Sequence, residues 1–293
     1  DFLESSGKSG TVIFYGCPGE EGGAGKAFMA REGLWRGLDF ALTWHPSDVN
    51  EVVTGTNNSS IQVLYKFHGV SAHAAGDPEN GRSALDAVEL MNTGVQYLRE
   101  HMTSDCRVHY AIIDAGGVSP NVVQSEASVL YMVRANKVRD SVKLLARVDK
   151  IAQGAALMTE TSFDRQFIDG TAELVPNYTL EELLYRIFNE VGLPEYSAEE
   201  KALAEALRKT YDVTTAPGIA AGFDADIAAD VAERTNGLSD ALCGFIMPEY
   251  HSAGFVAGST DVGDVSWQTP AAQLDTPGRT SAAAEPASAT RVS

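Results

Sequence analysis

The sequence has no long hydrophobic run, no basic cluster and only three cysteines. No stretch approaches about 18 uninterrupted apolar residues, and the opening DFLESSGKSG lacks the basic and apolar regions of a signal peptide. The 22 Lys and Arg residues against 40 Asp and Glu residues give a formal charge of −18, so the surface repels phosphate backbones and anionic lipid. The cysteines, Cys17, Cys106 and Cys243, lie far apart and form no CxxC pair. We therefore expect a soluble, cytoplasmic protein without disulfides, and neither a nucleic acid nor a membrane as its partner.

The sequence has enough apolar residues for a large core. It is 44% hydrophobic with 27 Gly over 293 residues, which favours a globular chain of two domains over one large domain. Residues 11–16, TVIFYG, have the pattern of a strand buried on both faces, residues 25–38 have helical spacing, and residues 40–46 predict a second buried strand. Together they predict a right-handed parallel crossover, with ligands at the carboxyl ends of the strands. The first ten residues resemble the end of a helix, which we interpret as a sign that an upstream segment has been cut away.

From Ser60 the pattern changes to the order strand, helix, strand, strand, helix, strand. This is the split unit of a ferredoxin-like α+β layer, and we place the domain at residues 58–172. Its predicted elements are strands at 60–69, 107–116, 126–135 and 161–172, and helices at 83–102 and 141–158. Two acidic amphipathic helices, 179–193 and 197–212, then return the chain to the first domain. Residues 271–293 contain almost no large apolar side chain and predict a disordered tail.

The strongest local feature is GCPGEEGGAGK (16–26), where Glu20 and Glu21 are adjacent in a glycine-rich turn. Adjacent carboxylates at a strand end are costly unless a cation is present. A metal ion would let one glutamate act as a ligand while the other takes a proton from water. The alternative is a solvated loop whose glycines shape a turn. A phosphate-binding loop is rejected, because the GK pair is followed by Ala and the two carboxylates would repel phosphate.

Four further side chains are candidates for chemistry. His45 ends the second predicted strand, where it could reach an ion held by Glu21 or simply be hydrogen-bonded. His73 lies in a loop of small residues that could project from one domain toward another, or be an ordinary loop histidine. Asn121, in a Gly/Pro turn, and Arg134, at the end of the following strand, could together clamp a substrate carboxylate, although Arg134 could equally be a surface charge. A later Gly/Asp-rich loop, 258–267, could shape the site.

Five segments in this order carry a resemblance to a known family: CPGEEGGAGK, WHP, SAHAAGDPENGRSALDAVELM, GGVSPNVVQSEASVLYMVRA and GSTDVGDVSW. They resemble metallopeptidase family twenty, the di-metal amidohydrolases that include aminoacylases and carboxypeptidases. The resemblance covers residues 1–270 and is strongest to a branch that cleaves aryl-glutamate amides. It implies the α/β class, with a zinc-exopeptidase-like α/β/α catalytic domain from 1–57 and 173–270. The ferredoxin-like domain at 58–172 would be an inserted lid that also makes a homodimer, with a paralogous partner subunit as a further possibility.

The resemblance also implies a role for each candidate side chain. Glu20 matches the general base, and Glu21 and His45 match ligands of two divalent metal ions, zinc or manganese. His73 matches the histidine of the lid that polarises the scissile carbonyl, usually in the site of the other subunit. The substrate carboxylate would be held by the positions that match Asn121 and Arg134. The implied function is hydrolysis of the amide bond of an N-acyl amino acid or an aryl-glutamate.

Two family features are missing from the sequence. A His-rich metal motif of the type HACGHN belongs upstream of the paired glutamates, and no histidine follows His251, where the last ligand is expected. Glu21 and His45 are fewer than the three ligands that an open catalytic site keeps. The alternative is therefore an inactive fragment or pseudo-enzyme that retains dimerisation and carboxylate binding. A third hypothesis, a generic α/β protein that binds a small molecule, explains the paired glutamates less well.

Overall fold

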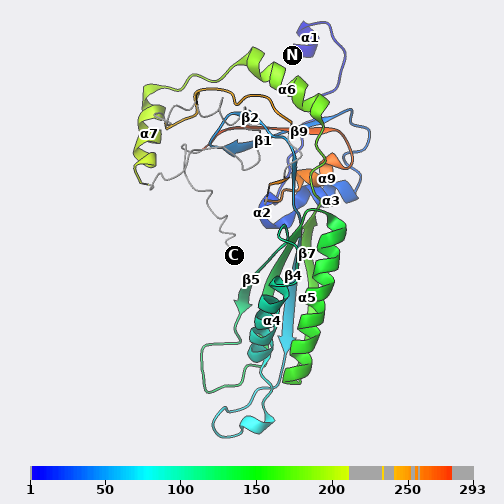
Figure 1. Cartoon of the computed structure of the whole chain (residues 1–293), viewed down its shortest axis with the longest axis vertical. Coiled ribbons are helices and arrows are strands. Elements are labelled where there is room, and N and C mark those ends of the chain that lie inside the picture. The colour runs from blue at the N-terminus through cyan, green and yellow to red at the C-terminus, as the bar shows by residue number, and fades with distance from the viewer. Residues whose placement is uncertain (1, 211–232, 234–240, 252–254, 257, 279–293) are drawn as a thin grey trace.

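The computed structural model describes residues 2–210, 233, 241–251, 255–256 and 258–278. Its helices are α1 (Phe2–Ser5), α2 (Glu20–Gly23), α3 (Gly25–Arg31), α4 (Ala84–Arg99), α5 (Val138–Thr159), α6 (Tyr178–Val191), α7 (Ala198–Arg208) and α9 (Val262–Ser266). Its strands are β1 (Ala41–Ser47), β2 (Glu51–Val52), β3 (Thr56–Asn57), β4 (Ser59–His68), β5 (Arg107–Asp114), β6 (Glu126–Ala135), β7 (Ser162–Thr171), β8 (Phe255–Val256) and β9 (Ala271–Pro277). Figure 1 shows an elongated part, with β4, β5, β7, α4 and α5, extending from a part built around β1, β9 and β2.

The elongated part, which we call the α+β unit (residues 59–171), has the predicted order of elements. Its sheet is antiparallel with the strand order β5-β6-β4-β7, and α4 and α5 pack against one of its faces. The other face we call the open face. This arrangement confirms the ferredoxin-like α+β layer, and the mixed α/β class is confirmed for the described chain as a whole.

Alternation along β4 explains why this sheet has one covered face. Val63, Tyr65 and Phe67 are fully buried beneath the helices, while Lys66 between them is exposed. The two helices complete the core with apolar residues spaced three and four apart, such as Val88, Met91 and Val95 of α4. Ser83 caps α4 by accepting a hydrogen bond from the Asp86 amide at 3.1 Å. The sequence pattern therefore suffices to fix this unit.

The α+β unit has two ends with different neighbours. At the near end, where the chain enters and leaves the unit, one row runs across the sheet through Thr171, Ser60, Arg134 and Arg107. The loops at 69–83 and 115–125 lie at the opposite, far end, at the bottom of Figure 1.

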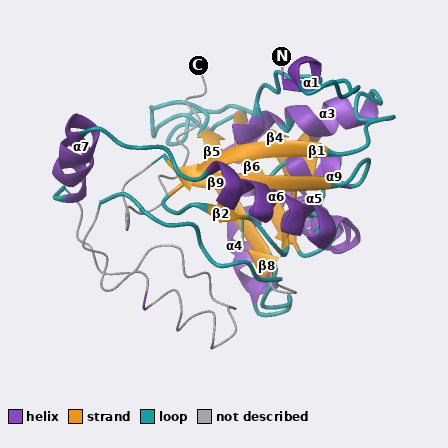
Figure 2. Cartoon of the chain, turned by 90° about the horizontal axis from the view of Figure 1, so that it is seen from above, coloured by secondary structure: helices purple, strands orange, loops and turns teal. Residues whose placement is uncertain are grey.

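The second sheet has the order β1-β9-β2, with β9 in the centre and parallel to β1 (Figure 2). The disordered tail predicted from residue 271 is thus wrong for residues 271–277, because these residues form its central strand. Ala271 and Ala272 of β9 are buried, so small apolar residues provide core contacts that a search for large ones overlooks. Residues 279–293 of the predicted tail lie outside the described residues.

The strand predicted at 11–16 is wrong. No described residue between 8 and 19 is in a strand or helix, and the side chains of Val12 and Phe14 are 85% and 94% exposed. Tyr15 instead packs edge-on against Trp35, with ring centroids 4.7 Å apart, and donates a hydrogen bond to the Leu34 carbonyl at 3.1 Å. These contacts hold the segment beside the turn after α3. The segment therefore does not pair with β1, whose parallel neighbour is β9.

Three other predicted elements form with changed limits. The helix predicted at 25–38 is α3, which ends at Arg31 and continues as turns. The strand predicted at 40–46 is β1, but it is buried on one side at most, since Trp44 is 57% exposed. The later helices match α6 and α7, and α7 begins with a capping box between Ser197 and Glu200. No helix in the described ranges is long and apolar enough to cross a membrane.

Candidate functional site

The glycine-rich turn at 16–26 places the paired glutamates through an unusual backbone. Gly19 and Gly22 have φ angles of 67° and 107°, a region that disfavours side chains, and they flank the two glutamates. A Cβ on Gly25 would lie 1.9 Å from the Pro18 carbonyl oxygen, so the turn closes only with glycine there. As a result Glu20 is half-buried and Glu21 is exposed. The two adjacent carboxylates therefore have different surroundings.

Glu20 faces the loop at 258–267, which lies more than 200 residues away in the sequence. Burial raises the pKa of Glu20, a hydrogen bond with the Thr260 side chain lowers it, and the negative charges of Asp261 and Glu21 raise it further. The net effect is a pKa above the ordinary value for a glutamate. A carboxylate with such a raised pKa is a stronger base, which is the property required for accepting a proton from water.

Lys26 and Asp261 join the turn to this loop. Lys26 Nζ lies 2.8 Å from one oxygen of Asp261, and the Lys26 amide donates to the other oxygen, also at 2.8 Å. The Asp261 side chain is fully buried. Because a buried ion pair with two hydrogen bonds has little freedom, Asp261 fixes the position of the turn that carries Glu20.

The same loop also holds the segment that leaves the α+β unit. Asp264 accepts a hydrogen bond from the Ala172 amide at 3.0 Å, and Trp267 Nε1 donates to the Glu173 carbonyl at 3.0 Å. Burial raises the pKa of Asp264 to about 6, against the opposing effect of the Ala172 amide. A Cβ on Gly263 would lie 2.0 Å from the Ala172 carbonyl oxygen, so the contact requires glycine. The loop at 258–267 is thus the joint between the Glu20 turn and the α+β unit.

Metal-ligand geometry is absent from the described residues. Glu21 is exposed, and His45 is an exposed residue of β1 whose parallel neighbour in β9 is Asp275. No described contact joins Glu21 to His45, and the described ranges contain no group of three or more His, Cys, Asp or Glu side chains that could hold a metal ion. Since a catalytic site keeps about three protein ligands, these residues do not fit a complete metal site. We therefore derive no catalytic step through a metal ion.

His73 and Asn121 meet at the far end of the α+β unit. The Ala74 amide donates to the Asn121 carbonyl at 2.9 Å, and the Val123 amide donates to the Ala72 carbonyl at 3.0 Å, so the two far-end loops pair. His73 Nδ1 accepts hydrogen bonds from the Gly76 amide at 3.0 Å and the Ala75 amide at 3.2 Å. Because Nδ1 is an acceptor, the ring proton is on Nε2, which points its N–H away from the loop backbone. His73 is exposed and is set up as a hydrogen-bond donor.

Arg134 lies at the near end of the α+β unit, opposite to His73 and Asn121. It is half-buried at the near end of β6, its Nε and Nη2 contact Met132 Sδ at 3.2 and 3.1 Å, and burial lowers its pKa. Eight residues of β6 separate Arg134 from Glu126, a span of roughly 27 Å for an extended strand, and Asn121 lies in the loop before that strand. The predicted clamp of Asn121 and Arg134 on one carboxylate therefore cannot form within one subunit.

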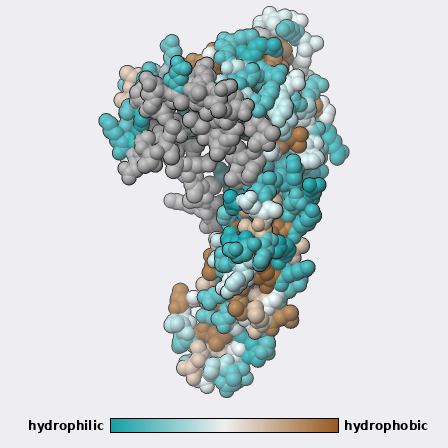
Figure 3. Space-filling view, viewed as in Figure 1, coloured by the Kyte–Doolittle hydropathy of each residue, from teal (hydrophilic) through white to brown (hydrophobic). Residues whose placement is uncertain are grey.

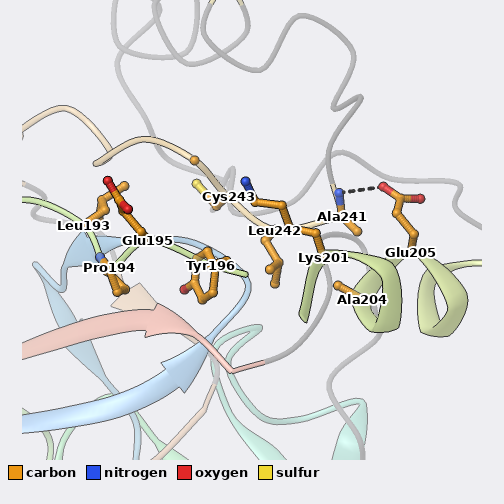
Figure 4. A pocket seen from close by; sticks show the side chains of 11 residues that line it. Leu193, Pro194, Glu195, Tyr196, Lys201, Ala204, Glu205, Ala241, Leu242 and Cys243 are labelled. Carbon is orange, nitrogen blue, oxygen red and sulfur yellow. Dashed lines mark hydrogen bonds between the residues drawn. The ribbon is translucent and has the colours of Figure 1, made fainter. Parts of the chain in front are cut away.

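The sequence analysis missed the residues that hold Glu20. Lys26, Thr260 and Asp261 lie in two of the segments that carry the family resemblance, but nothing in either segment indicates that these side chains meet. It also missed a cavity of about 630 Å³ between the chain at 193–196, the start of α7 and the chain at 241–244 (Figure 4). None of the six candidate side chains lines that cavity.

Comparisons with known proteins identify the family to which the α+β unit is similar. Residues 56–159 match the peptidase dimerisation domain, which covers most of the α+β unit. The chain is 32% identical over 196 residues to Xaa-Arg dipeptidase from Mus musculus, a match that covers 66% of this chain and 44% of the relative. The resemblance to metallopeptidase family twenty is confirmed, and the chain carries the dimerisation domain of that family.

The particular relative is a hydrolase subunit. The chain is 44% identical over 282 residues to one of the subunits of p-aminobenzoyl-glutamate hydrolase from Escherichia coli (strain K12), a match that covers 94% of this chain and 58% of the relative. A crystal structure of an aminobenzoyl-glutamate utilization protein from Klebsiella pneumoniae shares the fold, with a TM-score of 0.56 and 20% identity, over 89% of this chain and 56% of that one. The chain spans about half the length of the relatives it matches.

Proposed function

We propose that this protein hydrolyses the amide bond of aryl-glutamates such as p-aminobenzoyl-glutamate, or of related N-acyl amino acids. The observation that carries the proposal is the half-buried Glu20, held by Thr260 at the joint between the two parts of a chain that is 44% identical to a p-aminobenzoyl-glutamate hydrolase subunit. Glu20 is the general base toward water and returns the proton to the leaving amine. Residues 1–57 and 173–270, extended by β9, are the catalytic domain, and residues 58–172 are the lid.

Arg134 binds the substrate carboxylate in the same subunit as Glu20. Helix α2, which begins at Glu20, contacts β7, and the near-end row of the sheet places Arg134 two strands from Thr171 of β7. Two strand spacings are roughly 10 Å. A bound substrate spans about this length between the protein group that contacts its scissile amide and the group that contacts its carboxylate. This geometry supports Arg134 as the carboxylate-binding residue of its own subunit.

His73 and Asn121 act in the site of a partner subunit. Their position at the far end, roughly 27 Å from Arg134, excludes a shared substrate within one chain. If edge strand β5 pairs antiparallel with β5 of a second copy, the far end of each sheet meets the near end of the other. His73 Nε2–H then donates to the developing oxyanion of the scissile carbonyl, and Asn121 assists Arg134 in binding the carboxylate.

The surface of the lid supports this dimer. Strand β5 is an edge of the four-stranded sheet, and apolar residues are exposed on it and on α4 beside it: Tyr97 at 72%, Ile113 at 50%, Ile112 at 47% and Tyr110 at 41%. Several apolar patches are visible on the lid in Figure 3. Exposed apolar edges are normally covered by another chain, and the matched domain is a dimerisation domain. We propose a homodimer, with a paralogous subunit as the alternative partner.

Divalent metal dependence is implied by the family, and we propose zinc or manganese as the ion. Glu21 and His45 are the two side chains of this chain that match its ligands. Two ligands do not make a complete metal site. The described residues contain no cluster of three or more side chains that could hold a metal ion, and this observation favours a second candidate function. In that alternative the chain dimerises and binds carboxylate ligands without turnover.

A mixing experiment tests the shared site. His73→Ala and Arg134→Ala should each reduce hydrolysis of p-aminobenzoyl-glutamate by about 100-fold, because each removes one charged or polar contact with the reacting substrate. In a 1:1 mixture of the two variants, half of the dimers are mixed and each contains one intact site, so about a quarter of wild-type activity should return. Activity is measured after the subunits have been exchanged.

A second mixture is the matched control. Glu20 and Arg134 are contributed to each site by the same subunit. Mixed dimers of Glu20→Gln and Arg134→Ala therefore contain no intact site and should stay inactive. Recovery in the first mixture alone supports the shared site. No recovery in the first mixture, with mixed dimers present, would exclude it.

A further inference from the structure

The near end of the lid gathers positive charge that the linear sequence scatters. Arg107 and Arg134 are directly opposite each other on β5 and β6, and His109 lies two residues along β5 on the same open face. Arg99, at the end of α4, donates from Nη2 to the Val108 carbonyl at 2.6 Å, so it lies at the same edge. Burial lowers the pKa of His109, and the nearby positive charges of Arg134, Arg99 and Arg107 lower it further.

This concentration of charge is unfavourable unless an anion is present. Like charges directly opposite each other on neighbouring strands destabilise a sheet, and the chain as a whole carries a charge of −18. In the described part of the chain, Arg107 donates to the backbone carbonyls of Ser104 and Cys106, and Arg99 to Val108 and the Gln96 side chain. These neutral partners orient the two guanidinium groups without cancelling their charge.

We propose that Arg107 and His109 form an anion subsite beside Arg134 that binds the second carboxylate of a dicarboxylic amino acid. The inference rests on the proposed function, in which Arg134 binds one carboxylate of the substrate. Arg107 supplies the charge, and His109 supplies a ring N–H donor. The side chains of Arg107 and His109 stand on the open face, so antiparallel pairing of the β5 backbone leaves them accessible.

The subsite explains a preference for glutamate over neutral amino acids. Two carboxylates need two separate cationic partners, and Arg107 lies one strand spacing, roughly 5 Å, from Arg134. That separation matches the distance between the two carboxylates of a short dicarboxylic acid. A substrate with a neutral side chain would leave the charge of Arg107 without a partner.

Equilibrium binding to the full chain tests the subsite independently of catalysis. The probes are p-aminobenzoyl-glutamate and p-aminobenzoyl-glutamine, which differ only in the side-chain carboxylate, and affinities are measured by titration calorimetry at fixed ionic strength. The wild-type protein should prefer the glutamate probe. Arg107→Gln and His109→Gln should weaken binding of that probe about 10-fold or more, with less than a threefold effect on the glutamine probe.

Arg139→Gln is the matched control, because Arg139 is an exposed residue of α5 that pairs with Asp140. It should leave both affinities unchanged. An equal loss for both probes in the Arg107 and His109 variants would overturn the inference, as would a wild-type protein that shows no preference or binds neither probe. Selective binding without hydrolysis would contradict the proposed function alone, whereas hydrolysis without selectivity would contradict the subsite alone.

Discussion

Glu20→Gln is expected to reduce hydrolysis of p-aminobenzoyl-glutamate by about 10²- to 10⁴-fold, the usual contribution of a positioned general base. The substitution keeps the size of the side chain and its ability to hydrogen-bond with Thr260 but removes the basic oxygen. Because Glu20 does not touch the lid residues that bind carboxylates, the affinity for p-aminobenzoyl-glutamate should change little. The measurement is kcat from initial rates, with affinity from calorimetry on the same sample.

Glu32→Gln is the control for this substitution. Glu32 caps the end of α3, twelve residues after Glu20, and is an exposed partner of Arg31. It should keep wild-type activity. A Glu20→Gln protein with nearly full activity would show that another group takes the proton and would remove the base from the proposed mechanism.

Glu51→Gln is expected to stabilise the protein above neutral pH. Glu51 lies in β2 opposite Asp275 of β9 and near Asp48, and both of these carboxylates are buried. Burial, followed by the charges of Asp275 and Asp48, raises the pKa of Glu51 to about 8. Three carboxylates gathered in this way cannot all be ionised without a cost, and a neutral glutamine removes one of the charges.

The sign of the pH dependence follows from the raised pKa. The folded protein holds the Glu51 proton more tightly than the unfolded chain, so this contribution to stability is complete below pH 4.5 and is lost as the pH rises toward 8. The loss amounts to about 2–5 kcal/mol for a shift of this direction and size. The variant should therefore be less sensitive to pH between 4.5 and 8 and more stable than wild type at the upper limit.

Urea unfolding at several pH values measures this effect. Glu190→Gln, at an exposed position of α6, is the control and should follow the wild-type curve. If Glu51→Gln destabilised the protein at pH 8, the carboxylate would have a stabilising partner and the raised pKa of Glu51 would be wrong.

The sequence predicted the α+β unit well and the other part of the fold poorly. In the unit, alternation along β4 and the three-and-four spacing of α4 depend on neighbours close in the sequence or on one repeated period, so pattern alone identified them. The neighbour of β1 is instead β9, about 230 residues later, and its small residues carry no strong apolar signal. The segment at 11–16 has an apolar run but forms no strand, because an apolar run becomes a strand only when a partner strand is available.

The sequence motifs indicated which side chains are candidates but not how they lie in space. Motif order singled out Glu20 and His73, because both lie in glycine-rich or small-residue loops with a distinctive composition, and their roles stay predictions. The strand predicted at 126–135 already placed Asn121 before its start and Arg134 near its end, and the predicted clamp overlooked the length of that strand. The hydrogen bond of Thr260 with Glu20 and the meeting of Arg107 with Arg134 depend on long-range pairing, which residue spacing does not encode.

The most direct test of the account is whether the purified chain releases p-aminobenzoate from p-aminobenzoyl-glutamate, with bound metal measured by elemental analysis on the same sample. After dialysis against zinc or manganese, the account predicts release of p-aminobenzoate by the wild-type protein and no release by Glu20→Gln, and the elemental analysis shows whether turnover goes with bound metal. A folded dimer that binds the substrate but releases no product would contradict it, whatever its metal content. That result would identify the chain as a carboxylate-binding relative of the hydrolases.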